Sequence, residues 1–239
     1  MGTHDNHHED RFYRYAIYFT PEEKTPLYAM GSEWLGRDAS SGLAARPGLP
    51  DAIGLDQWRE ATASPRRYGF HATLKPPFPL APGRCADELR ASLRAFARGR
   101  KPHLSPPLTV GAIGGFLALI PSGPYPELCQ LAADCVRHFE DFRAPAAAED
   151  LARRRHPKLS PRELEHLSRW GYPYVLDAWK FHMTLTGPLE EEPRRRFHQH
   201  LGRLFAPPCE TPLPVASICL FAEREPNSEF FLIERAALG

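Results

Sequence analysis

The sequence lacks the features that mark several large classes of protein. Its five cysteines are odd in number and show neither metal-binding nor redox spacing, so they do not suggest a disulfide framework. No apolar run approaches the length that spans a membrane. The net charge is only +1, which argues against a long nucleic acid as partner. With no signal peptide visible, we expect a cytoplasmic protein with reduced thiols and no membrane partner.

The chain is instead rich in proline, and its 26 prolines predict many turns and short elements. Apolar periodicity and capping residues predict the order strand, helix, motif strand, helix, hairpin, helix, helical insert, motif strand, helix and two closing strands. This order predicts an α+β protein with antiparallel sheets. We expect residues 1–11 to be a disordered tail and residues 12–239 to form a single domain, with a helical insert at about 141–174.

One short pattern occurs twice in the chain. Tyr68-Gly69-Phe70-His71-Ala72-Thr73-Leu74-Lys75 and Trp179-Lys180-Phe181-His182-Met183-Thr184-Leu185-Thr186 both read aromatic-His-x-Thr-Leu. Each copy is typical of a strand, in which successive side chains point to opposite faces. Alternation predicts a polar face that holds Arg67, His71, Thr73 and Lys75 in the first copy, and Lys180, His182, Thr184 and Thr186 in the second. Two polar faces of this kind suit the walls of a groove.

The side chains of the repeat suit phosphodiester chemistry better than carbonyl chemistry. A histidine with an ordinary pKa near 6.5 gives or takes a proton at neutral pH, so His71 and His182 could act as base and acid around one reacting atom. Hydroxyls of Thr73 and Thr184 can donate hydrogen bonds to anionic oxygens. Cations can offset the charge of a phosphate, and the candidates beside the motifs are Arg67, Lys75 and Lys180.

Two other interpretations of the histidines remain open. A single His-x-Thr-Leu is common as a structural element, and only the repetition of the pattern in the same context argues against that role. Histidine is also a common metal ligand, but neither motif has a second His, Cys or carboxylate at ligand spacing. We therefore predict no metal site, and neither motif has a convincing Ser or Cys nucleophile beside it.

At these residues the chain resembles the two-histidine (2H) phosphoesterase superfamily, which is defined by two His-x-Thr/Ser motifs in a bilobal fold. The stretch Arg66–Phe78 and the stretch Phe181–Gly187 resemble the phosphonate metabolism proteins of that superfamily, which are encoded with phosphonate-utilisation genes. The resemblance implies two antiparallel sheets about a central cleft, with the histidines facing each other across it. Lys180 stands where many relatives have Arg, which keeps the charge but loses the bidentate fork.

The resemblance also implies an activity: metal-independent hydrolysis of a small cyclic phosphate without a cofactor. The substrate it suggests is a ribose cyclic phosphate such as 5-phosphoribosyl 1,2-cyclic phosphate. Two alternatives stay open. One is processing of RNA ends that carry a 2′,3′-cyclic phosphate or a 2′-5′ linkage. The other is a module that binds a phosphorylated sugar or nucleotide without turning it over.

The insert at 141–174 holds the remaining candidates for substrate binding. Its arginine run at 153–155 is either a solvated helix end or part of a lid whose cations meet a second phosphate. Among the insert's cations we favour Arg143 for that phosphate, because it lies in a family-like Phe-Arg-Ala-Pro stretch. Tyr172 and Tyr174 could line a sugar ring or simply belong to the core. Outside the insert, Tyr68 of the first motif is a further candidate for binding the substrate or its phosphate.

Overall fold

The computed structural model describes residues 12–45, 47–50 and 53–239, so the predicted tail at 1–11 lies outside the described residues. Its larger sheet has seven strands in the order β4-β5-β6-β2-β1-β8-β9, and a smaller sheet pairs β3 with β7. Every pairing is antiparallel, which confirms the predicted α+β class. The strands are β1 Arg14–Phe19, β2 Ala72–Phe78, β3 His103–Ser105, β4 Leu108–Ile113, β5 Phe116–Pro121, β6 Met183–Thr184, β7 Leu213–Val215, β8 Ser217–Glu223 and β9 Phe230–Ala237.

The seven-stranded sheet has a narrow seam between its two halves. We call β4, β5 and β6 the first half, and β2, β1, β8 and β9 the second half. The halves are joined where β6 pairs with β2, and the Cα partners there are Ala72 and Met183. Each half therefore contributes one copy of the repeated motif to the seam.

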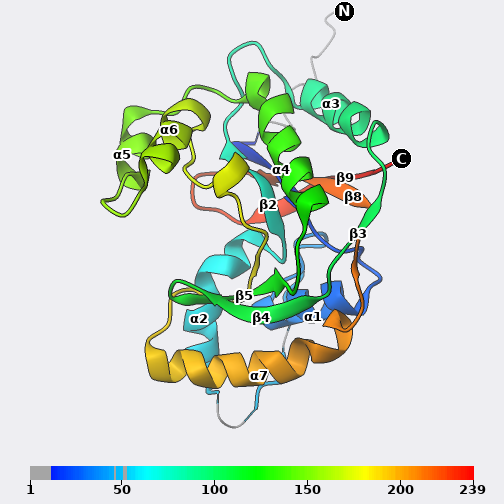
Figure 1. The fold of residues 1–239 in the computed structure, drawn as a ribbon, viewed down its shortest axis with the longest axis vertical. Coiled ribbons are helices and arrows are strands. Elements are labelled where there is room, and N and C mark those ends of the chain that lie inside the picture. Colours follow the sequence, from blue (N-terminus) through cyan, green and yellow to red (C-terminus); the bar gives the residue numbers. More distant parts are fainter. Residues whose placement is uncertain (1–11, 46, 51–52) are drawn as a thin grey trace, which may run out of the picture.

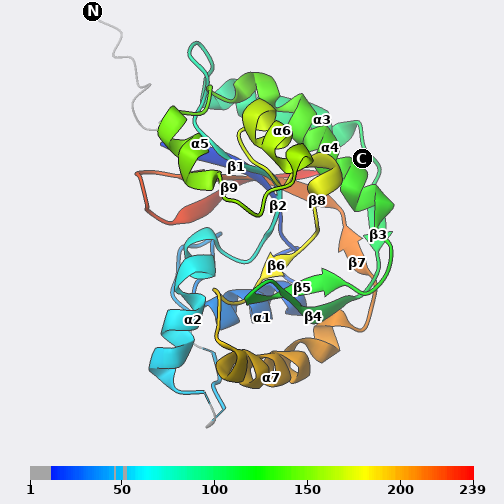
Figure 2. The ribbon, with the colours of Figure 1, turned by 60° about the vertical axis from the view of Figure 1, so that its left-hand side comes forward.

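Helices cover the two halves separately (Figures 1 and 2). Helix α7 packs on the first half and α1 packs against α7, whereas α3 and α4 pack on the second half. Helices α5 and α6 belong to the insert and lie beside each other, far from α7 (Figure 1). The helices are α1 Pro26–Leu35, α2 Leu55–Tyr68, α3 Ala86–Arg98, α4 Pro126–His138, α5 Ala148–Arg154, α6 Pro161–Trp170 and α7 Glu191–Cys209, with short 3-10 turns at Glu140–Phe142 and Leu176–Ala178.

Tryptophan hydrogen bonds tie the helices of the first half to the second motif. The Trp34 indole of α1 donates to the Leu185 carbonyl at 2.9 Å, and its ring meets Phe197 of α7 edge-on. The Trp179 indole donates to the Thr73 carbonyl at 2.7 Å, which joins the second motif to the first across the seam. Buried N–H groups need such partners, so these bonds fix the strand ends that carry the motifs.

Most predicted helices are confirmed, with one difference near the first motif. Helix α1 begins at Pro26 with Thr25 as its N-cap. Helix α2 was not predicted, although its buried residues Trp58, Ala61, Thr62 and Pro65 follow helical spacing. The pattern is hard to recognise because charged residues surround it. Pro65 also lies within the last turn, and a proline inside a helix usually argues against one. In the described residues no helix is both long and apolar enough to cross a membrane.

Candidate active site

The two motifs meet at the seam with their histidines at equivalent positions. His71 directly precedes β2 and His182 directly precedes β6, so neither lies inside the long strand that alternation predicted. Because the strands are antiparallel about the pair Ala72 and Met183, the adjacent positions bring His71 opposite Thr184 and Thr73 opposite His182. Each histidine thus faces the threonine of the other motif.

Both imidazoles are oriented by the backbone two residues earlier. Nδ1 of His71 lies 2.9 Å from the Gly69 carbonyl, and Nδ1 of His182 lies 2.8 Å from the Lys180 carbonyl. A carbonyl only accepts, so Nδ1 carries the proton in each neutral ring and Nε2 keeps its lone pair. In the first motif this Nε2 is 3.2 Å from the Thr73 hydroxyl. Each ring can therefore accept a proton at Nε2 in its present orientation.

Gly69 permits this arrangement at the first motif. It closes α2 with φ +78°, and a Cβ at this position would lie 2.5 Å from the Cβ of Ala39. A left-handed residue with no space for a side chain must be glycine. The close turn brings the chain directly from α2 into His71.

Aromatic packing keeps both histidines neutral at pH 7. The Tyr18 ring stacks on His71 with 3.8 Å between ring centroids, and Phe221 approaches the imidazole from 6.3 Å. The pKa of His71 is lowered to about 4, chiefly by burial and in smaller part by the nearby His182, against the opposing effect of the hydrogen bond to the Gly69 carbonyl. Burial also lowers the pKa of His182.

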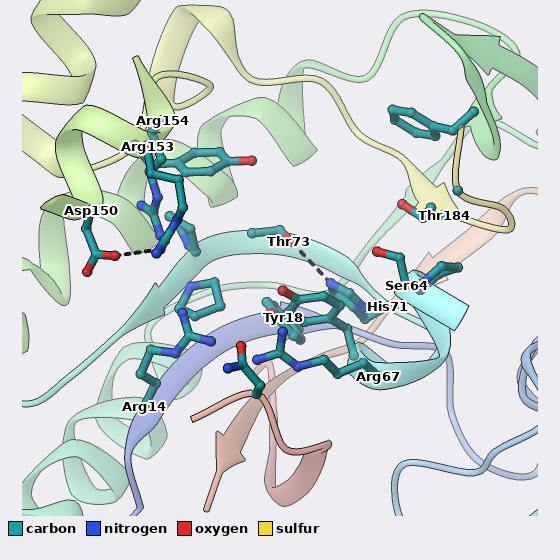
Figure 3. A pocket seen from close by; sticks show the side chains of 18 of the residues that line it. Arg14, Tyr18, Ser64, Arg67, His71, Thr73, Asp150, Arg153, Arg154 and Thr184 are labelled. Atoms are coloured by element: carbon teal, nitrogen blue, oxygen red, sulfur yellow. Dashed lines mark hydrogen bonds and ion pairs between the residues drawn. The ribbon is translucent and has the colours of Figure 1, made fainter. Parts of the chain in front are cut away.

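A cleft of about 730 Å³ opens beside the seam. Figure 3 shows His71 and Thr184 on one side of it and Arg14, Arg153 and Arg154 on the other. The predicted residues that line it are His71, Thr73, Thr184, Arg67, Tyr68 and Tyr172. His182 lies next to this lining, with its ring 5.8 Å from that of Phe116, which does line the cleft.

The structure does not bring Lys75 into the cleft, contrary to the prediction. Its side chain is only 2% exposed, and its ammonium group donates to Glu140 at 2.7 Å and to the Val136 carbonyl at 3.0 Å. Both partners lie at or just beyond the end of α4, on the covered side of the sheet. Lys75 thus joins the sheet to α4 and its following turn, and does not line the cleft.

A β-bulge explains why strand alternation fails at Lys75. Tyr18 of β1 pairs with Thr73, but the next residue along β1, Ile17, pairs with Lys75. Leu74 is therefore an extra residue in β2. A bulge of this kind changes the face on which the following side chains lie.

Besides Lys75 and His182, three other predicted residues lie outside the cleft lining. Arg143 is held by Glu140, with Nη2 2.6 Å from a carboxylate oxygen, and it lines a smaller neighbouring pocket of about 220 Å³. Lys180 is exposed to solvent. Tyr174 is 40% exposed, and its hydroxyl lies 3.0 Å from His156. Of the two insert tyrosines, only Tyr172 faces the cleft.

The cleft also contains residues that sequence reasoning did not assign. Arg14 and Tyr18 come from β1, and Ser64 comes from the unpredicted helix α2. Arg153 and Arg154 of α5 line the cleft, whereas Arg143, the favoured arginine of the insert, does not. The signal for Arg14 was its position at the start of an otherwise apolar strand. In the described part of the chain, no three His, Cys, Asp or Glu side chains are grouped so as to hold a metal ion.

Comparison with known proteins identifies the family. Residues 73–231 match the family described as "Protein of unknown function (DUF1045)", and the chain belongs to it. It is 37% identical over 228 residues to "Ribose 1,5-bisphosphate phosphokinase PhnN" of Janthinobacterium sp. (strain Marseille), covering 91% of this chain and 49% of that protein. A protein of the same name from Laribacter hongkongensis (strain HLHK9) is 35% identical over 226 residues, covering 92% and 50%. The chain therefore spans about half the length of the curated relatives it matches.

Among solved structures, the chain is similar to Escherichia coli LigT complexed with NADP+. The match has a TM-score of 0.43 and 13% identity, and it covers 95% of this chain and 98% of the other.

Proposed function

We propose that this protein is a cyclic phosphodiesterase of the 2H type that hydrolyses a ribose cyclic phosphate without a metal ion. The observation that carries the proposal is the meeting of two His-x-Thr motifs at one seam, each imidazole bonded through Nδ1 to the carbonyl two residues earlier. In this proposal, the two Nε2 atoms and the two threonine hydroxyls act on one phosphorus centre. The motif resemblance is consistent with this chemistry.

In the proposed reaction, Nε2 of one histidine takes a proton from water as its oxygen bonds to phosphorus. The bond from phosphorus to one ring oxygen breaks, and Nε2 of the other histidine gives that oxygen a proton. Thr73 and Thr184 donate hydrogen bonds to the nonbridging oxygens. Because both imidazoles are neutral in the free protein, the acid must be protonated, and the nearby negative charge of the substrate favours this by raising its pKa.

The names of the relatives support a phosphorylated ribose as the substrate class. They describe a kinase acting on ribose 1,5-bisphosphate, and this chain matches half of each. Cleavage of a ribose 1,2-cyclic phosphate at oxygen 2 leaves the phosphate on oxygen 1. If the ribose also carries a 5-phosphate, the product is ribose 1,5-bisphosphate. We therefore propose a reaction whose product is the compound in the relatives' name.

The test is a turnover assay on a panel of substrates, followed by ³¹P NMR. The panel contains 5-phosphoribosyl 1,2-cyclic phosphate, the same ring without the 5-phosphate, nucleoside 2′,3′-cyclic phosphates and a 2′-5′ dinucleotide. We expect fastest turnover of the first, with phosphate retained on oxygen 1. A separate reaction with ATP and ribose 1,5-bisphosphate tests the kinase reaction. Preference for the nucleotides would support RNA-end processing, and ATP-dependent phosphorylation alone would contradict the proposal.

Variants of the histidines identify the chemistry. His71→Ala and His182→Ala should each lower kcat by about 10²–10⁴-fold, the usual contribution of a general acid or base. Arg59→Gln is a matched control, because Arg59 lies on α2 with its side chain 57% exposed and paired to Asp56. Near-normal turnover by either histidine variant would refute the mechanism. Tight binding without hydrolysis by the unchanged protein would favour the binding module.

A further inference from the structure

Four arginines line the cleft from two sides. Arg14 begins β1 and Arg67 lies in the last turn of α2, whereas Arg153 and Arg154 end α5 in the insert. Figure 3 shows Arg14, Arg153 and Arg154 on the side of the cleft away from Thr184. His71, Thr73 and Thr184 therefore line one part of the cleft, whereas Arg14, Arg153 and Arg154 line another.

A buried carboxylate holds two of the arginines that line the cleft, Arg14 and Arg67. Glu223 of β8 is completely buried and accepts from Nε of Arg14 at 2.6 Å and from Nη2 of Arg67. Nε of Arg67 also donates to the Ser228 carbonyl at 2.9 Å. Two guanidinium groups have ten N–H donors, more than one carboxylate can accept. Glu223 thus orients both guanidinium groups, and each group keeps N–H donors that are free to bind a ligand.

The charges around this part of the cleft do not cancel. Two carboxylates pair with these four arginines: Glu223 pairs with Arg14 and Arg67, and Asp150 pairs with Arg153 at 2.5 Å. Arg154 donates to the Gly171 carbonyl and lies over the Tyr172 ring, 5.3 Å from its centroid. Four cations against two carboxylates leave an excess of two positive charges among these residues. A phosphate monoester carries about −1.5 to −2 at pH 7, which matches that excess.

We propose that Arg14, Arg67 and Arg154 form a second anion site, specific for a phosphate monoester on the same molecule whose cyclic diester lies at the His-x-Thr pairs. This inference rests on the proposed function for the identity of the molecule, but the anion site itself does not require turnover. Glu223 is its positioning residue, since it touches the arginines and not the ligand. The site draws on both the sheet and the insert, so a bound monoester joins the two.

The test measures binding of D-ribose 5-phosphate by titration calorimetry, with D-ribose as the uncharged comparison. This sugar has the monoester but no cyclic diester, so hydrolysis does not interfere. We expect Arg14→Gln, Arg67→Gln and Arg154→Gln each to weaken binding of ribose 5-phosphate by about 10- to 100-fold, the range for a hydrogen bond to a charged group. Arg59→Gln, on the same helix as Arg67, should bind like the unchanged protein. Thermal unfolding checks that each variant folds, and Arg154 in the insert provides a variant remote from the sheet.

The outcomes separate this site from the catalytic proposal. Equal affinity of all three folded variants, or no preference for ribose 5-phosphate over ribose, would overturn the second anion site even if cyclic phosphates are hydrolysed. Selective loss in the variants supports the site even if no substrate in the panel turns over. Turnover assays also test the positioning role of Glu223. The Glu223→Gln variant should raise KM for the 5-phosphorylated substrate more than for the same ring without that phosphate, and kcat should change less than KM. Equal increases in KM would contradict a positioning role.

Discussion

The packing of Tyr18 against His71 predicts a specific dependence of stability on pH. The pKa of His71 is lowered from 6.5 to about 4 in the folded protein, chiefly by burial. The unfolded chain therefore binds a proton more readily than the folded chain between these two pH values. The contribution of this histidine to stability is complete above pH 6.5 and falls as the pH is lowered through 6.5 toward 4.

The size of the effect follows from the two pKa values. At about 1.36 kcal/mol for each pH unit, lowering the pKa from 6.5 to about 4 corresponds to a loss of up to about 3 kcal/mol from the free energy of unfolding. Replacing His71 with glutamine removes the titrating group while keeping a polar side chain. The stability difference between the unchanged protein and His71→Gln should therefore shift by up to that amount between pH 7 and pH 4.

Urea unfolding at several pH values between 4 and 7 measures this difference. Arg59→Gln provides the control, because an arginine does not titrate in this range and its stability difference should stay constant. NMR titration of the His71 ring gives the pKa directly. A stability difference for His71→Gln that is the same at pH 7 and pH 4 would refute the argument that the aromatic environment excludes the charged imidazole.

Further predictions follow from the same site. The profile of kcat/KM against pH should be bell-shaped with its optimum below pH 6.5, because the pKa values of both histidines are lowered; an optimum above pH 7.5 would contradict this. Activity should survive treatment with EDTA, and loss reversed by a divalent ion would indicate a metallohydrolase. Gly69→Ala should lower the free energy of unfolding by at least about 1 kcal/mol, measured in urea, because alanine is strained at positive φ and meets Ala39. Lys75→Met should leave KM nearly unchanged, whereas a large increase would place Lys75 at the substrate after all.

Short-range features of the chain were predictable from sequence. The chain begins with the predicted strand, β1, and α6 has the capping box at Ser160 and the left-handed Gly171 that its sequence indicates. The repeated motif also predicted that two His-x-Thr pairs would come together. These features depend on spacing over a few residues, which a single sequence displays directly.

The remaining errors come from contacts between distant residues. Nothing near Lys75 signals the bulge, because the bulge exists only in relation to the partner strand β1. Arg14 and Glu223 are 209 positions apart, so their pairing across β1 and β8 has no local sign. Arg143 was favoured because it lies in a family-like Phe-Arg-Ala-Pro stretch, but whether Arg143 or Arg154 lines the cleft depends on how the insert folds against the sheet. Residues that line the cleft only through tertiary contacts were therefore the least predictable.

The position of β1 in the sheet has a consequence for synthesis of the chain. This early strand lies between β2 and β8, and its residues Tyr15–Phe19 are buried. On the ribosome, one edge of β1 has no partner until residues 217–223 have been made. At translation rates of 5–20 residues per second this interval is roughly 10–40 s. During that time an apolar strand edge is open to pairing with other chains, so the yield of folded protein should rise at low expression rates or with chaperones that cover nascent strands.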